Sequence, residues 1–383
     1  MIGGALLASR LVMLAGMTAV LHGIPAAAVY MAGHFADADW YHAIAAGGYA
    51  GGGVGPLKAA FYPGYPLLAA LVAAPFRVVL PAGLLSAPAP PDTSVRDWLV
   101  VAAQLLVSNA CLVVALVALW KLYRPRLGST ATLIGSCLLV AAPNAFFLSS
   151  GHSESAFLAA TALAFLMAER GRWVPAGVAA AAAALIRAPG ILLLVPLAII
   201  WLRSSRPRGP AVAALAIALA GAAAFPVYTW VTFGDPLRYV HSEAYWHASR
   251  ANPIATYVEL LRRLWLGVRE ALHVRPSPID RWYSSRVQIL DGLMLLWATA
   301  CGLLGRIPLG LAHVAWILLL VVFPLPAGGN PVSTNRYLLV AFPAFYLVGW
   351  WLRRRPLLAV PATLGGMVAM FVFSGEAMNS FVG

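Results

Sequence analysis

The sequence is poor in charge, and above all in acid. Only 13 of its 383 residues are Asp or Glu, and charged residues of both signs make up 10% of the chain, whereas soluble domains carry about 25%. A chain with so little charge is not an ordinary water-soluble domain. The 3 cysteines, Cys111, Cys137 and Cys301, all lie in apolar runs, which excludes a disulfide framework and a cysteine metal site.

Hydrophobic residues are correspondingly abundant, at 61% of the chain with a mean hydropathy of +0.82. A helix needs about 20 apolar residues to span a bilayer. Runs near this length predict an all-α polytopic membrane protein with one domain over 1–383. The runs are 5–30, 61–81, 98–120, 129–149, 153–168, 174–202, 211–232, 287–304, 309–325, 337–352 and 357–374. Since the first run exceeds the apolar core of a signal peptide, about 7–15 residues, we expect a retained helix.

The net charge of +13 comes from short basic clusters at the ends of these runs. Such clusters are typical of cytoplasmic loops that meet anionic lipid, and they do not indicate a nucleic-acid partner. The clusters are Lys121/Arg124/Arg126, Arg170/Arg172, Arg203/Arg206/Arg208 and Arg353/Arg354/Arg355. If all are cytoplasmic, 174–202 must enter and return with a break near Arg187-Ala188-Pro189-Gly190, and 61–81 must do the same with a break near Pro75. The alternative is that every run is a single span.

Two long hydrophilic stretches, 32–60 and 233–286, separate the runs and are expected on the extracytoplasmic side. In the second stretch, apolar residues repeat at spacings of three and four from Val258 to Leu272, which predicts an amphipathic helix. Such a helix either lies on the membrane surface or packs on the bundle as a lid.

Two of the few carboxylates, Asp37 and Asp39, stand two positions apart in the first hydrophilic stretch. A carboxylate beside lipid is costly unless it is solvated or has a task. We therefore predict that one of them is a general base. The structural alternative is that either residue caps a helix beginning at Trp40, because Asp is a favoured N-cap.

Aromatic residues surround this pair. Trp40 and Tyr41 follow it directly, and Tyr62 and Tyr65 belong to the segment Phe61-Tyr62-Pro63-Gly64-Tyr65-Pro66. We predict that these four side chains bind substrate as a wall of the site. Anchoring at the membrane interface, where Tyr is common, is the alternative.

Further polar residues interrupt later runs: His152 and Glu154 in Gly151-His152-Ser153-Glu154-Ser155, then Arg187, and finally Arg336 with Tyr337. Ionisable residues inside membrane segments point to function. Because a guanidinium suits a phosphate, we predict that this second group of residues binds a phosphate-bearing substrate. The alternatives are that Glu154 and Arg187 form a buried ion pair that aligns helices, and that Arg336 contacts lipid headgroups.

Taken in order, these segments resemble the integral-membrane mannosyltransferase family that includes PIG-V, the enzyme that adds the second mannose of glycosylphosphatidylinositol anchors. The family's first element is roughly W-D-x-x-W/F-Y/F-x-x-I-A-x-x-G-Y, and this sequence departs from it at Ala36, where the family has Trp. The matching segments are Asp37 to Tyr49, Phe61 to Leu67, Ser153 to Phe157, Arg187 to Gly190, and Arg336 to Pro343.

The resemblance implies a GT-C glycosyltransferase bundle of about 9–13 transmembrane or re-entrant helices, in a bacterial plasma membrane with its site on the extracytoplasmic face. It implies polyprenyl-phosphate mannose as the donor, a lipid-linked or surface glycan as the acceptor, and inversion at the sugar. By motif position Asp37 is the base, with Asp39 the second choice. No metal or cofactor is expected. The alternatives are another polyprenyl-phosphate sugar, a flippase of lipid-linked sugars, and a non-catalytic subunit.

Overall fold

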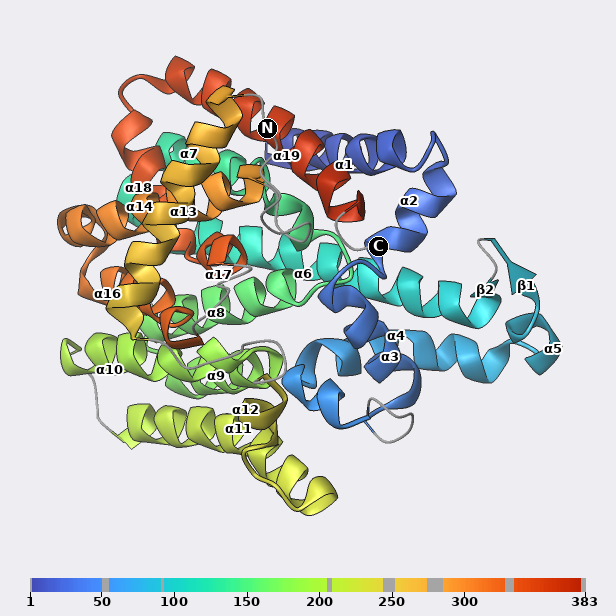
Figure 1. The fold of residues 1–383 in the computed structure, drawn as a ribbon. Helices are drawn as coiled ribbons and strands as arrows, with labels where there is room; N and C mark the ends of the chain where they lie inside the picture. The colour runs from blue at the N-terminus through green and yellow to red at the C-terminus, as the bar shows by residue number, and fades with distance from the viewer. Residues whose placement is uncertain are drawn as a thin grey trace.

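The computed structural model describes residues 2–49, 55–90, 93–204, 209–243, 252–273, 285–327 and 334–379. Within these ranges the chain is a helical bundle with one small pair of antiparallel strands, β1 (Pro88–Ala89) and β2 (Thr93–Ser94) (Figure 1). Five of the described helices are long and apolar enough to cross a membrane. They are α1 (Ile2–Val20), α6 (Val95–Leu127), α11 (Gly209–Phe233), α14 (Ser285–Leu304) and α19 (Ala359–Asn379). The predicted all-α class is confirmed.

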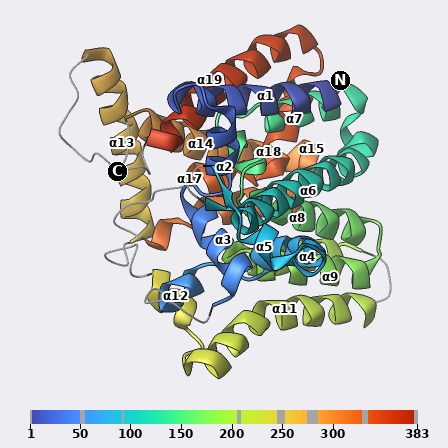
Figure 2. The ribbon, with the colours of Figure 1, turned by 90° about the vertical axis from the view of Figure 1, so that its right-hand side faces the viewer.

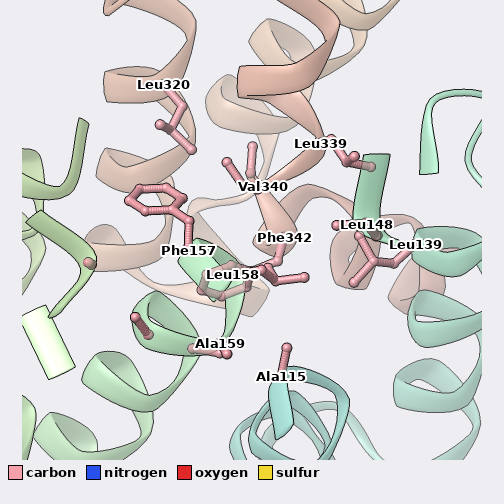
Figure 3. Close-up of a cluster of buried hydrophobic side chains, with 14 of the residues drawn as sticks. Ala115, Leu139, Leu148, Phe157, Leu158, Ala159, Leu320, Leu339, Val340 and Phe342 are labelled. Atoms are coloured by element: carbon pink, nitrogen blue, oxygen red, sulfur yellow. The ribbon is translucent and has the colours of Figure 1, made fainter. Parts of the chain in front are cut away.

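The centre of the bundle is α8 (Glu154–Glu169), which lies between α6 and α9 (Trp173–Ile186) (Figure 1). Between its terminal residues, Glu154 and Glu169, the side chains are small or apolar and nearly all are buried, so the helix packs on every face. Figure 3 shows Phe157 and Leu158 of this helix among Leu320 of α16 (Leu311–Val322) and Phe342 of α18 (Phe342–Leu352). This core fixes the position of Glu154, the first residue of α8.

The run 174–202 folds back on itself, as predicted. It forms α9, the short 3-10 helix η3 (Ala188–Leu193) and α10 (Leu194–Leu202). Gly171 before α9 and Arg203 after α10 line the same cavity, whereas Arg187 at the break contacts Glu154. The backbone at Arg187 is extended, and Pro189 and Gly190 follow it. A Cβ at Gly190 would lie 2.4 Å from backbone atoms of Ala183 and Ala184, so the turn requires glycine.

The predicted break at Pro75 is wrong. Residues 64–79 form one continuous helix, α4 (Gly64–Val79), with Pro75 inside it. A proline removes one helical hydrogen bond without necessarily ending the helix. Ala69 and Ala73 of α4 pack against Val100 and Ala103 in the N-terminal half of α6.

Three other runs are divided more finely than predicted. The run 5–30 is α1 followed by α2 (Pro25–Ala32), because His22 and Gly23 between them adopt positive φ of 54° and 78°. The run 129–149 is α7 (Ser129–Val140) and η2 (Ala145–Leu148), and 337–352 contains the end of α17 (Thr334–Leu339) and then α18. The remaining short elements are η1 (Gly55–Ala60), α5 (Ala82–Leu85), α15 (Arg306–Leu309), η4 (Leu325–Ala327) and η5 (Pro356–Leu358).

The described basic clusters gather at one end of the bundle, which we call the basic end. Arg126 near the end of α6 binds Glu169 at the end of α8, and both line a cavity with Arg203. Gly349, near the end of α18 and the cluster at 353–355, packs against Ala131 at the start of α7. Residues 206 and 208 of the predicted clusters lie outside the described residues.

The second hydrophilic stretch contains α12 (Arg238–Glu243) and the predicted amphipathic helix, α13 (Pro253–His273). Leu260 is buried and Leu264 packs against Gly292 of α14, so one face of α13 covers the bundle (Figure 2). Val258 and Trp265, from the predicted apolar stripe, are exposed on another face. The helix thus packs as a lid while it presents a second apolar face outward.

Candidate functional site

The first hydrophilic stretch forms α3 (Asp37–Gly47), which begins at Asp37 itself. Its N-cap residue, Ala36, has a positive φ of 52°, and no side chain caps the helix. The predicted alternative, in which Asp37 or Asp39 caps a helix starting at Trp40, is therefore wrong. Ala36 occupies a sparsely populated backbone region, which costs about 1–3 kcal/mol and is more common at functional sites.

Four charged residues from four distant segments form one network, which we call the quartet: Asp37, Glu154, Arg187 and Arg336. Arg336 donates from Nη1 to Asp37 and from Nε to Glu154 Oε1 at 2.7 Å. Arg187 donates from Nη1 to the same Glu154 oxygen at 2.6 Å. Glu154 thus bridges the two arginines, and the quartet carries no net charge.

The quartet runs from the surface of the protein into its core. The side chain of Asp37 is 37% exposed, those of Arg336 and Arg187 are 4% and 9% exposed, and that of Glu154 is fully buried. Glu154 is the first residue of α8, where the helix dipole favours negative charge. Asp37 is therefore the quartet member that a substrate in solution or at the membrane surface would meet first.

Aromatic rings support both arginines. The Arg187 guanidinium lies 5.0 Å from the ring centre of Tyr337, and that of Arg336 lies 4.7 Å from the ring of Phe147. Such cation–π contacts stabilise a guanidinium that has lost its water. Tyr337 is half-buried and follows Arg336 directly, so α17 contributes to the surroundings of both cations.

The tyrosines of the first segments divide between two roles. Tyr41 is buried, and its hydroxyl lies 3.0 Å from that of Ser153, which also accepts from Arg187 Nη1 at 3.2 Å. Tyr65 is fully buried and donates to the Gln104 carbonyl at 3.1 Å, with its ring edge-on to Tyr41. Tyr41 therefore touches the quartet's hydrogen-bond network, whereas Tyr65 supports it from behind.

Other predicted binding residues lie farther out. Trp40 stacks on Phe61 with ring centres 5.3 Å apart, and Tyr62 packs against Phe225 and Tyr239. Tyr62 thus packs with rings of α11 and α12, whereas Trp40 packs on the segment that precedes α4. Asp39 is exposed, and within the described residues it forms no ion pair with the quartet.

His152 is fully buried between Phe35 and Phe147. Its Nδ1 lies 2.9 Å from the Ser150 hydroxyl, and its Nε2 has no hydrogen-bond partner among the described atoms. Burial, reinforced by the charge of Arg336, lowers the pKa of His152 to about 3. The imidazole is therefore neutral at physiological pH.

One polar group behind the quartet was not predicted. Asp291 of α14 is fully buried and accepts from both the backbone and the side-chain amide of Asn335, each at 2.7 Å. Asn144 donates to the Asn335 carbonyl at 2.7 Å. Asn335 precedes Arg336, so this clamp holds the turn that carries the arginine. The signal was available, because Asp291 is an acid inside the apolar run 287–304.

Within the described ranges, no three His, Cys, Asp or Glu side chains are placed to hold a metal ion. That the protein acts without a metal ion remains a prediction, since only an activity measurement tests it.

No protein-family model matches the sequence, and no curated protein does. A matching solved structure is the oligosaccharyltransferase of Archaeoglobus fulgidus in complex with zinc and sulfate, at 14% identity and a TM-score of 0.40. The match covers 85% of this chain and 45% of that chain, so this chain spans less than half its length. A likeness this distant establishes neither the family nor the activity, and the resemblance to the PIG-V family stays a prediction.

Proposed function

We propose that this chain is a GT-C glycosyltransferase of the PIG-V-like kind, which transfers mannose from polyprenyl-phosphate mannose to a lipid-linked or surface glycan. The observation that carries the proposal is the quartet. Asp37, Glu154, Arg187 and Arg336 come from separate motifs up to 299 residues apart and meet in one hydrogen-bonded network.

A purely structural ion-pair network would explain part of this arrangement, because buried charges must be paired. It does not explain why the network reaches the surface through a carboxylate. Asp37 is more than a third exposed, and the residue before it is held in an unfavourable backbone conformation. An exposed carboxylate in front of two buried cations is the arrangement that a base and a leaving-group phosphate require.

In the proposed reaction, Asp37 accepts the proton of the acceptor hydroxyl as its oxygen attacks the anomeric carbon. The bond from that carbon to the phosphate oxygen breaks on the opposite face, so the sugar centre inverts. The phosphate leaves as an anion and needs little protonation, so one base is enough.

The hydrogen bonds distinguish the two arginines. Arg336 uses Nη1 for Asp37 and Nε for Glu154, and its buried Nη2 lies 2.7 Å from the same Glu154 oxygen. The hydrogen bonds of Arg187 within the described residues all come from Nη1. Arg187 thus keeps N–H groups that bind a phosphate oxygen in the proposed complex. Arg336 orients Asp37 and adds positive charge near the developing anion.

The proposed setting is a bacterial plasma membrane, with the quartet on the extracytoplasmic side. The support is the distribution of charge: the described arginine clusters lie at the basic end, and the quartet lies at the other end of α8. Basic residues favour the cytoplasmic side.

The experiment is transfer of radiolabelled mannose from polyprenyl-phosphate mannose to a membrane lipid extract by the purified protein, with and without EDTA. Asp37→Asn preserves shape and an acceptor for Arg336, so the variant should fold, and its rate should fall by about 10²–10⁴. Asp39→Asn is the matched control on the same helix and should retain activity within about twofold, since an exposed carboxylate away from the quartet contributes little.

Full turnover by Asp37→Asn would exclude that residue as the base. If the folded wild type transfers glucose or arabinose instead, the sugar assignment is wrong and the glycosyltransferase assignment stands. Movement of labelled lipid-linked sugar across proteoliposome membranes, without any transfer, would identify a flippase.

A further inference from the structure

A cavity of about 340 Å³ opens at the basic end of the bundle, away from the quartet. It lies between the ends of α6, α8 and α10 and the start of α16. Glu154 and Glu169 mark the two sites on α8, and the 15 residues between them span roughly 22 Å at 1.5 Å per residue. The cavity is therefore a separate site.

Arg126 supplies one cation of the cavity and is anchored by three contacts. It donates to the Leu309 carbonyl at 2.6 Å and to Glu169 at 3.0 Å, and its Nη1 lies 3.2 Å from His313 Nδ1. Arg203 supplies a second cation. Its side chain is exposed, and it forms no ion pair within the described residues. Since the charge of Arg126 balances that of Glu169, the charge of Arg203 makes the cavity lining positive overall.

His313 places a buried donor in the cavity wall. A guanidinium can only donate, so the contact with Arg126 makes Nδ1 the acceptor and puts the imidazole hydrogen on Nε2. The residue is 1% exposed, and Nε2 has no hydrogen-bond partner among the residues that the structure describes; it lies 3.5 Å from Glu169 without forming a hydrogen bond. A buried donor left without an acceptor costs about 1–3 kcal/mol, which a ligand with acceptor oxygens would recover.

The start of α16 adds three more donors. The N-cap residue is Gly310, which has no side chain to accept from the first turn. The first three helical residues, Leu311, Ala312 and His313, all line the cavity. Their backbone amides have no partner within the helix, and such a helix terminus favours anions.

The apolar part of the lining indicates where the anion comes from. Ile199 and Ile200 of α10 and Leu309 and Leu311 beside α16 contribute hydrocarbon surface next to the cations. A cavity with cations, free donors and an apolar wall suits an amphiphile with an anionic head. We propose that this cavity binds the phosphate headgroup of an anionic membrane lipid, held by Arg203, His313 Nε2 and the first amides of α16.

The test uses the full-length protein in detergent and measures lipid binding by native mass spectrometry and the unfolding midpoint. The probes are phosphatidylglycerol, phosphatidylcholine and inorganic phosphate. Phosphatidylglycerol should bind the wild type more tightly than phosphatidylcholine and raise its midpoint. Arg203→Ala should weaken that binding about tenfold, which corresponds to one charge-assisted hydrogen bond.

Two further variants locate the site. Arg306→Ala removes an exposed arginine near the same end that does not line the cavity, and it should bind as the wild type does. Ala312→Leu fills the cavity beside the helix start without changing any charge, and it should also lose binding; its midpoint without lipid shows whether it is folded.

If inorganic phosphate raises the unfolding midpoint as much as phosphatidylglycerol does and loses this effect in Arg203→Ala, the result would support a phosphate site and assign it to a free phosphate rather than to a lipid. Equal weakening by Arg306→Ala would show general attraction to the basic end and overturn the site. Binding that does not discriminate between the two lipids, or that survives Ala312→Leu, would overturn it as well.

Discussion

Replacing Glu154 with Gln tests the physical basis of the quartet directly. Glu154 is fully buried, and its Oε1 accepts from Arg187 at 2.6 Å and from Arg336 at 2.7 Å. Its Oε2 has no hydrogen-bond partner among the described atoms. The amide nitrogen of Gln therefore fits at Oε2 without breaking an existing bond. The substitution removes the charge and leaves the shape almost unchanged.

The magnitude follows from the charges left behind. In Glu154→Gln, two buried guanidinium groups face one carboxylate, Asp37. Removing one partner of a buried ion pair costs about 3–5 kcal/mol, a large share of a total stability of about 5–15 kcal/mol. In Arg187→Gln the excess charge is negative, because the carboxylates of Asp37 and Glu154 face only one guanidinium, that of Arg336. The double variant restores neutrality through Asp37 and Arg336, so it should be less destabilised than the sum of the single variants, by about 2–3 kcal/mol.

The assay is reversible unfolding of the purified protein in detergent, followed by far-ultraviolet circular dichroism, for the wild type, both single variants and the double variant. Glu259→Gln on α13 is the control, because its pairs with Arg262 and Arg263 are largely exposed and such pairs are worth about 0–1 kcal/mol. Additivity of the Glu154 and Arg187 substitutions within about 0.5 kcal/mol would refute the charge-balance reasoning.

Three other outcomes follow from the same structure. Asp291→Ala leaves two buried donors of Asn335 without an acceptor, so it should destabilise the protein by about 2–6 kcal/mol and, through Arg336, lower the rate of the proposed transfer reaction; full activity would exclude a positioning role. With its pKa at about 3 when folded and about 6.5 when unfolded, His152 binds a proton only in the unfolded state between these values. Wild-type stability should therefore fall as pH drops from 7 to 5, by about 2 kcal/mol more than in His152→Gln, and equal slopes in denaturant titrations would contradict this. Gly190→Ala forces a Cβ to within 2.4 Å of the α9 backbone, so it should lower both the unfolding midpoint and the activity, whereas Gly209→Ala, where the space is open, should change neither.

The charged residues of the site could be predicted because they are rare. In a chain with 13 acids, Glu154 stands at the start of an apolar run, and Arg187 interrupts another beside Pro189 and Gly190. A charge in such a place needs a partner, and the structure provides one for each. The pair of Glu154 with Arg187 was one of the predicted alternatives and is present at 2.6 Å. The pair of Asp37 with Arg336 could not be predicted, because these residues are joined only by the tertiary arrangement of α3 and α17.

The errors in the predicted fold have a common origin, which is that apolar composition does not define where a helix ends. Pro75 was predicted to break a helix that continues through it, whereas His22 and Gly23 break a run that was predicted to be continuous. In both cases the backbone geometry depends on packing against other elements. The break at Arg187 was predictable because three signals coincide there: a charge, a proline and a glycine.

The bond from Arg336 to Asp37 has a consequence for the proposed base. Arg336 donates from Nη1 to Asp37 and from Nε to Glu154 Oε1 at 2.7 Å, so the buried end of the quartet fixes the position of the exposed carboxylate. In the proposed reaction, Asp37 is therefore oriented towards the acceptor hydroxyl before the donor arrives, which lowers the entropic part of the barrier. Arg187, whose N–H groups are not all used within the quartet, receives the donor phosphate in the same proposal. The quartet thus divides the two tasks between its arginines: one positions the base and the other binds the leaving group.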